Sequence, residues 1–214
     1  MEHAARRRAA AGRRRQVIAA GHAGHLEEAR QGLDDPDPEV QAAALGALAR
    51  IGALSVPDIA RALTHDAAPV RRRATDAALS VRGRGSRSTL HELLVVALSD
   101  PDPLVVVGAA WFLSEHRATA AVTALTATAR GHDDVRCREA SVAALGAIGD
   151  VRGLPAVIAA LDDKPTVRRR AAVALAGFDD PRTEPALRRA AGDRDWQVRQ
   201  AADELLGDGS PSAT

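Results

Sequence analysis

The feature that most constrains the fold of this chain is a segment that recurs about every 31 residues. A valine opens each copy, and the six valines are separated by 30, 35, 30, 32 and 31 residues: Val40, Val70, Val105, Val135, Val167 and Val198. In five copies an alanine follows four positions later, and an alanine or leucine follows eight positions later, which is the spacing of one helical face. In the Val135 copy, Ala140 and Leu145 follow at five and ten positions, which predicts an irregular start to that helix. Repeats of this length are typical of two-helix modules, which bury their apolar faces only by stacking.

Each repeat also carries signals that start helices. Asp37–Pro38 and Asp102–Pro103 place a carboxylate at the N-cap and a proline at the first helical position, and Asp195 fills the same cap position. A second, shorter apolar stretch follows in each unit, at residues 56–63, 90–98, 120–129, 154–161 and 185–190. We therefore expect an all-α fold, a right-handed α–α solenoid of six helical hairpins plus a terminal helix.

The repeat also predicts the domain organisation. Aligning residues 18–35 with 146–163 pairs Gly21 with Gly149, extends the array to the N-terminus and puts Arg13 in the small-residue position of the first unit. We expect one solenoid over residues 1–206, with residues 1–16 as a basic N-terminal arm and residues 207–214 as a disordered tail.

Composition and charge narrow the class of protein. Aromatic residues make up only 2% of the chain, which favours closely packed helices over a β-sandwich. The net charge is +1, yet the first 16 residues hold six arginines and one glutamate, so the rest is mildly acidic, unlike a protein that wraps nucleic acid. The longest apolar run, residues 104–113, is too short to cross a membrane, and the single cysteine forms no internal disulfide. We expect a cytoplasmic protein without a membrane segment.

The pattern Asp-x-Asp-x-x-Val-Arg-x-x-Ala-x-x-x-Leu, most complete at residues 193–206, resembles the HEAT-like repeats of the phycobilisome-lyase type across residues 1–206. The resemblance implies a binding scaffold. It also implies a polar ladder between successive units, made by the first aspartate and the arginine after the valine: Asp35, Asp100, Asp162 and Asp193 with Arg71, Arg136, Arg168 and Arg199. The ladder is incomplete, because Gln41 and Val106 stand in the arginine position and His65 stands in the aspartate position.

Residues for catalysis are scarce. The deoxyhypusine hydroxylases are similar arrays and hold a di-iron site on several His-Glu pairs, whereas this chain has only His91-Glu92. Cys137 lies between Arg136 and Arg138, which favour a lowered thiol pKa, but the sequence offers it no matching histidine and asparagine. We predict no enzyme, no catalytic residue, no metal and no cofactor.

Nucleic-acid binding is the second hypothesis. HEAT-like alkylpurine glycosylases are broadly similar and hold DNA on a basic face, although their cluster of aromatic and acidic residues is not visible here. The residues for such a role come from the arginine triplets: Arg6, Arg7, Arg8, Arg13, Arg14, Arg15, Arg72, Arg73, Arg169 and Arg170.

Protein binding is the first hypothesis. On a helical wheel, Phe112 points into the core, whereas Val107 and Trp111 lie nearly opposite it. We predict that Val106, Val107 and Trp111 form an outward apolar patch, since tryptophan is enriched at binding hot spots. Three alternatives remain for what covers this patch: an unidentified protein partner, a second copy of the chain in a homodimer, or the loop at residues 81–88. The sequence therefore predicts a non-enzymatic protein–protein interaction scaffold.

Overall fold

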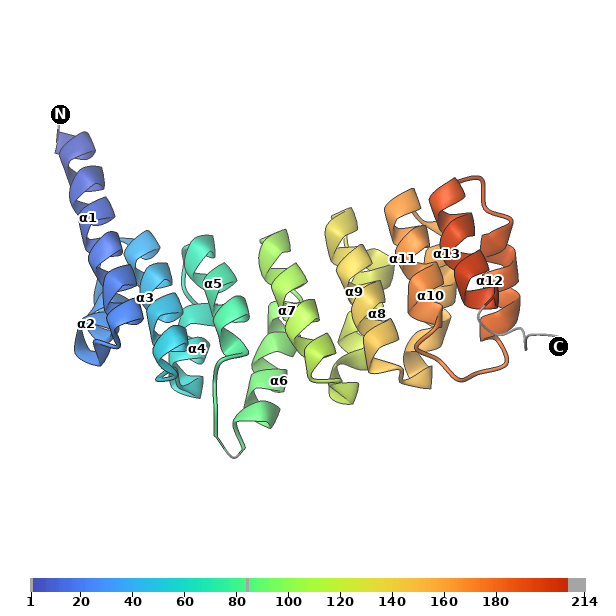
Figure 1. The fold of residues 1–214 in the computed structure, drawn as a ribbon, viewed down its shortest axis with the longest axis horizontal. Coiled ribbons are helices and arrows are strands. Elements are labelled where there is room, and N and C mark those ends of the chain that lie inside the picture. Colours follow the sequence, from blue (N-terminus) through green and yellow to red (C-terminus); the bar gives the residue numbers. More distant parts are fainter. Residues whose placement is uncertain (1, 84, 208–214) are drawn as a thin grey trace. The chain divides into compact units, whose positions relative to one another are not determined.

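The regular structure of the chain is helical throughout the part that the computed structural model describes, residues 2–83 and 85–207 (Figure 1). Within these residues there are thirteen α-helices, short 3₁₀ helices and no β-strand. The all-α fold with stacked helical repeats is the one that the 31-residue period predicts.

The helices form the expected six hairpins and a final helix. The first helices of the hairpins are α1 (Glu2–Ala23), α3 (Pro38–Ile51), α5 (Ala68–Ala78), α7 (Pro103–Glu115), α9 (Val135–Ile148) and α11 (Pro165–Leu175). The second helices are α2 (Leu26–Gln31), α4 (Val56–Leu63), α6 (Ser86–Ala97), α8 (Val122–Gly131), α10 (Leu154–Ala159) and α12 (Thr183–Ala191). Helix α13 (Trp196–Gly207) follows the last hairpin.

Contacts divide the chain into two compact units, Met1–Ala97 and Leu98–Thr214. In the first unit, α1 packs against α3 and α3 against α5. In the second unit, α7 packs against α9, α9 against α11, and α11 against α13 (Figure 1). Each helix therefore contacts mainly its neighbours, as in other repeat proteins.

The helix starts follow the cap signals of the sequence. The side chain of Asp37 accepts a hydrogen bond from Glu39 N, and that of Asp102 accepts one from Leu104 N, each at 2.9 Å. Asp195 accepts from Gln197 N at 2.9 Å. Such caps contribute about 1 kcal/mol each, so these carboxylates have a structural explanation.

Helix α9 shows why one repeat looked irregular. Its first buried position is taken by Cys137 and not by Val135, and Ser141 and Leu145 follow it at four and eight positions, each no more than 1% exposed. The predicted irregular start is therefore wrong. A reading based on valines alone missed a cysteine, which packs as a small apolar side chain.

Helix α1 also has a different alignment from the predicted one. A Cβ on Gly21 would lie 2.7 Å from Ala47 Cα, and a Cβ on Gly146 would lie 2.7 Å from Ala174 Cα, so both glycines allow close approach of the next helix. Gly21 therefore corresponds to Gly146 and not to Gly149. Arg13 consequently moves from the small-residue position to the position of Arg138 in α9.

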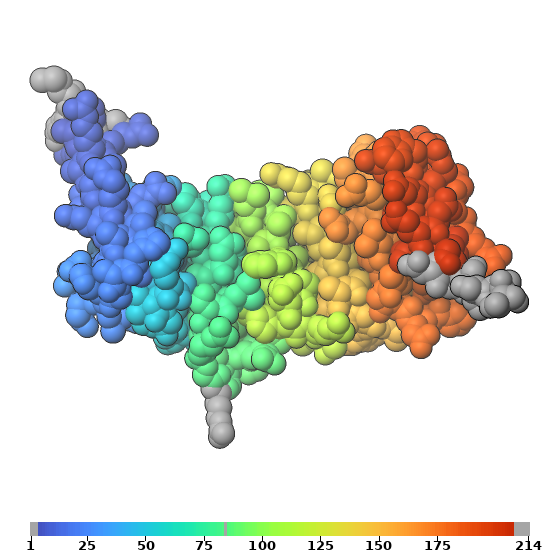
Figure 2. Space-filling view, viewed as in Figure 1, coloured from blue at the N-terminus to red at the C-terminus, as the bar shows by residue number. Residues whose placement is uncertain are grey.

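The two ends of the chain bear on the remaining domain predictions. Residues 2–16 of the predicted basic arm belong to α1, which extends past the other helices of its unit (Figures 1 and 2). At the C-terminus, Gly207 ends α13, and residues 208–214 of the predicted tail lie outside the described residues.

Candidate functional site

A polar ladder connects successive repeats within each unit. An arginine on one first helix forms a two-bond ion pair with the aspartate that precedes the next first helix. In the first unit, Arg13 reaches Asp35 at 2.6 and 3.0 Å. In the second unit, Arg138 reaches Asp163 at 2.7 and 2.8 Å. Such bidentate pairs are stronger and more directional than single bonds between neutral groups.

We call each such arginine–aspartate pair a rung of the ladder. The most buried of these three rungs joins Arg168 and Asp193. Arg168 reaches Asp193 with two bonds of 2.8 Å, and the side chains are only 5% and 13% exposed. A further guanidinium nitrogen of Arg168 donates to the carbonyl of Asp163 in the preceding turn at 2.9 Å. The arginine therefore closes its own turn and binds the next repeat at the same time.

Two predicted ladder residues have different partners. Asp162 is exposed and accepts a 3.4 Å bond from Arg189, so its neighbour Asp163 makes the rung instead. Arg136 pairs with the cap residue of its own helix, Asp134, at 2.7 Å. The ladder arginine of α9 is Arg138, because the helix begins its buried face at Cys137 and not at Val135.

Three other predicted ladder residues contribute to their own turns. Arg71 donates to the carbonyls of His65 and Asp66 at 2.9 and 2.8 Å. Arg199 donates likewise to the carbonyls of residues 193 and 194, at 2.8 and 3.1 Å. Asp100 accepts from the backbone N–H of residue 102 at 2.8 Å.

The acid dependence of stability should report on the ladder. The arginine of each rung, through its hydrogen bonds, holds the pKa of Asp35, Asp163 and Asp193 below the usual range. These carboxylates therefore stabilise the fold above their unfolded pKa of about 3.9, and that stability is lost as the pH falls through the folded pKa. Urea unfolding between pH 6 and pH 2 should show a steep loss below about pH 4. The same slope in Asp193→Asn would contradict this origin for that rung.

Two rungs have lost their charges on both sides. In the first unit, the ladder position of α3 holds Gln41 and the turn before α5 holds His65. In the second unit, the ladder position of α7 holds Val106 and the turn before α9 holds His132. Each histidine Nδ1 accepts a backbone N–H two residues on at 3.0 Å, as the carboxylates of Asp35 and Asp193 do. The histidine therefore preserves the hydrogen bond of the turn before the next helix. At both rungs, the loss of the carboxylate is accompanied by the loss of the arginine that would pair with it.

This exchange corrects the predicted apolar patch. Val106 is 0% exposed because it stands in a ladder position, which points between neighbouring helices. Its predicted place on the outer surface is therefore wrong. Trp111 is 49% exposed and Val107 is half-buried.

Sequence reasoning also missed one member of this surface. Leu104 is 43% exposed and precedes Val107 and Trp111 by three and seven residues, which places all three on one face of α7. The spacing was the available signal. We name Leu104, Val107 and Trp111 the α7 patch.

The arginines predicted for nucleic acid are dispersed. Arg6, Arg7, Arg8 and Arg15 are exposed along α1, whereas Arg13 belongs to the ladder. On α11, Arg169 is exposed. Arg170 donates a 3.3 Å bond to Glu139 of α9.

The other three arginines line a groove of about 420 Å³ across α1, α3 and α5. They are Arg14, Arg72 and Arg73. Glu39 and Asp76 lie in the same groove, so its charge is mixed. Burial raises the pKa of Asp76, with Arg73 acting against that shift.

The described residues contain no group of three or more His, Cys, Asp or Glu side chains that could hold a metal ion. Cys137 is buried, and burial raises the pKa of its thiol to about 11. The predicted lowering by the flanking arginines is wrong, because desolvation outweighs their attraction. The thiol is therefore protonated at neutral pH and is a weak nucleophile.

The repeat geometry has a counterpart in a known family. A model of HEAT repeats matches residues 90–172 and 154–210, which together span more than half of the chain. The chain belongs to the HEAT-repeat family. No curated protein sequence matches this HEAT-repeat chain. None of its described helices combines the length and apolar character needed to cross a membrane.

Solved structures share the architecture. One chain in the structure of the complex of CpcE and CpcF of phycocyanin lyase from Nostoc sp. PCC7120 is 25% identical in sequence to this chain. The TM-score is 0.59, over 85% of this chain and 76% of that one. A designed armadillo repeat protein in complex with the peptide (KR)4 is 18% identical, with a TM-score of 0.61 over 86% and 99% of the two chains. Human deoxyhypusine hydroxylase in complex with glycerol is 20% identical, with a TM-score of 0.50 over 92% and 79%. The last two similarities concern the fold alone.

Proposed function

We propose that this HEAT-repeat protein is a non-enzymatic scaffold that binds another protein through the α7 patch. The observation that carries the proposal is the exposure of Trp111, 49%, on the same helical face as Leu104 and Val107. Large apolar side chains that gather on a surface are typical of protein–protein contacts, and tryptophan is the side chain most enriched at their hot spots.

The comparison with CpcE and CpcF supports this proposal. That structure is a complex of two proteins, and one of its chains resembles this one over most of its length. The lyase activity in its name belongs to that protein, and the proposal takes from it only association with a protein partner.

Replacing Trp111 should weaken binding without disrupting the fold. We expect Trp111→Ala to weaken binding of the partner at least about 30-fold, since a hot-spot tryptophan contributes 2 kcal/mol or more. Trp196→Ala is the matched control, because Trp196 is 61% exposed on α13, where the polar residues Arg199 and Gln200 follow on the same face. It should change binding less than about 3-fold.

The measurement has two parts. Sedimentation of wild type and both variants tests for a homodimer, and co-purification from the native host followed by calorimetry with the recovered protein tests for a different partner. Equal binding by wild type and Trp111→Ala would exclude the α7 patch. Loss of dimer in Trp111→Ala alone would make a second copy the partner.

Nucleic-acid binding remains the second candidate function, because Arg6, Arg7 and Arg8 are exposed on the part of α1 that extends from its unit. Duplex DNA should then be retained at about 0.15 M salt by wild type and lost by the triple alanine variant of these arginines. Equal retention by both proteins would exclude this role for them.

A further inference from the structure

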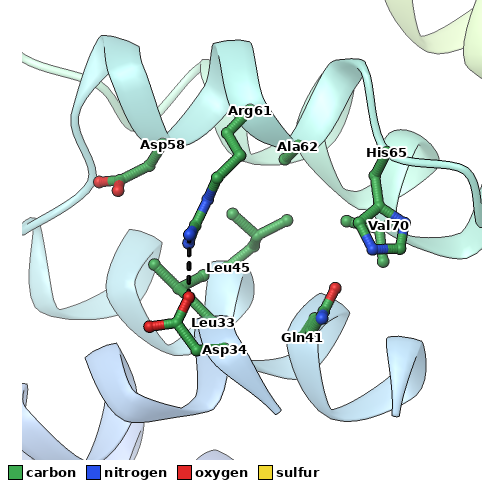
Figure 3. Close-up of a pocket in the computed structure, with 9 residues that line it drawn as sticks. All are labelled: Leu33, Asp34, Gln41, Leu45, Asp58, Arg61, Ala62, His65 and Val70. Atoms are coloured by element: carbon green, nitrogen blue, oxygen red, sulfur yellow. Dashed lines mark hydrogen bonds and ion pairs between the residues drawn. The ribbon is translucent and has the colours of Figure 1, made fainter. Parts of the chain in front are cut away.

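A cavity of about 300 Å³ lies in the first unit, at the rung that lacks its ion pair (Figure 3). Four apolar side chains contribute to its wall: Leu33, Leu45, Ala62 and Val70. Gln41 and His65 supply polar groups beside them, and Figure 3 shows both side chains directed into the same space. An ion pair of 2.8 Å between Arg61 and Asp34 crosses another side of the cavity.

The ladder position beside the cavity holds no arginine. At the intact rungs, Arg13, Arg138 and Arg168 extend from this same helical position to the aspartate before the next helix. Gln41 is shorter, and its Nε2 donates instead to the carbonyl of Asp35 at 2.7 Å. A pocket of about 430 Å³ also lies beside the intact Arg13–Asp35 rung, so the cavity is distinguished by its neutral polar groups and not by its size.

The hydrogen bonds of His65 and Gln41 determine which of their polar atoms can bind a ligand. His65 Nδ1 accepts from Ala67 N at 3.0 Å, so the neutral imidazole carries its proton on Nε2 and donates there. Gln41 uses its amide nitrogen for Asp35, which leaves Oε1 as an acceptor. Within the described residues, no hydrogen bond reaches either remaining atom. The cavity thus offers one donor and one acceptor next to an apolar wall.

We propose that this cavity binds the side chain of a tyrosine from a partner protein. The phenol ring matches the apolar wall, and the hydroxyl is the smallest group that accepts from His65 Nε2 and donates to Gln41 Oε1 together. The 214 residues contain no tyrosine, so the proposal takes the ring from a second protein. The site lies in the first unit and is independent of the α7 patch, so each can fail without the other.

Other side chains fit less well. A carboxylate would meet the oxygen of Gln41 and the carboxylates of Asp34 and Asp58, which also line the cavity. An ammonium would face the N–H of His65 and the guanidinium of Arg61, and the carboxylates of Asp34 and Asp58 are already paired with arginines. A phenylalanine would desolvate the donor and the acceptor without replacing their bonds to water, which costs free energy.

The test uses the full-length, ¹⁵N-labelled protein and two neutral probes, N-acetyl-tyrosinamide and N-acetyl-phenylalaninamide, in NMR titrations. We expect the tyrosine probe to shift the amide signals of residues around Gln41, His65 and Val70 and to bind about 5-fold more tightly than the phenylalanine probe, or more. No saturable shift with the tyrosine probe, equal affinity for both probes, or shifts confined to other repeats would overturn the proposal.

A double variant that restores the arginine and the aspartate of an intact rung is the matched control for this test. Gln41→Arg with His65→Asp restores the charges found at the intact rungs, so it should fold, remove the donor of His65 and the acceptor of Gln41, and abolish binding of the tyrosine probe. Gln41→Leu removes only the acceptor and should reduce the preference for tyrosine to about 2-fold or less. Unchanged tyrosine binding in a folded double variant, or an unchanged preference in Gln41→Leu, would place the probe elsewhere and refute the site.

Discussion

Arg168→Ala is expected to lower the free energy of unfolding of the second unit by about 3 kcal/mol, because it removes one partner of a buried ion pair. The arginine is 4% exposed and makes two bonds to Asp193 and one to the carbonyl of Asp163. After the change, Asp193 keeps a 2.7 Å bond from Asp195 N but loses its counter-charge. The desolvated carboxylate is then destabilising.

Arg182→Ala is the matched control for this prediction. Arg182 also makes two bonds to one carboxylate, Asp180, at 2.7 and 2.9 Å, but its side chain is 51% exposed. Exposed pairs contribute about 1 kcal/mol or less, so this variant should be close to wild type. Urea unfolding followed by circular dichroism measures both variants. Equal losses of unfolding free energy would mean that the buried ladder pair stabilises the fold no more than an exposed pair does.

The effect of Arg168→Ala should also be local. Since each repeat contacts mainly its neighbours, amide hydrogen exchange should accelerate most in α11 and α13. Helix α7 should keep most of its protection, because α9 separates it from α11, which carries the changed residue. Uniform acceleration across the second unit would contradict this and indicate that the unit unfolds as one body.

The repeat made the fold predictable from sequence. One helical face recurs with a small residue at its centre, and the cap signals mark where each first helix begins, so the six hairpins and the final helix follow. The errors came from alignment within a repeat. Cys137 replaces a valine at the first buried position of its helix. The predicted alignment of α1 was displaced by three residues, because it paired Gly21 with Gly149 and the structure pairs it with Gly146. Both errors assigned ladder roles to the wrong residues. A displacement of a few positions turns a residue to another face of the helix, so Arg136 was expected in the position that Arg138 holds.

The candidate site was less predictable, because it depends on pairs of residues that are distant in sequence. Val106 looked like a surface residue because its relatives are polar. Those relatives are ladder arginines that point between helices, so a valine in that position is buried when the facing residue is His132. The cavity beside Gln41 and His65 has the same origin: neither residue is unusual alone, and only the structure shows that they share one rung.

Phe112→Ala and Trp111→Ala test the orientation of α7, on which the α7 patch depends. Phe112 is 0% exposed and its ring stacks on that of His116, with centroids 4.2 Å apart. We expect its replacement to lower the free energy of unfolding by about 3 to 5 kcal/mol, through lost burial and the cavity left behind. Trp111 precedes it by one residue but is 49% exposed, so its replacement should cost about 1.5 kcal/mol or less.

The two variants therefore form a matched pair of aromatic residues on one helix, measured by the same urea unfolding experiment. A large loss for Phe112→Ala with a small loss for Trp111→Ala leaves the tryptophan free to bind a partner. If Trp111→Ala lost as much stability as Phe112→Ala, the indole would be part of the folded core, and the effect of that variant on binding would no longer report on a contact surface.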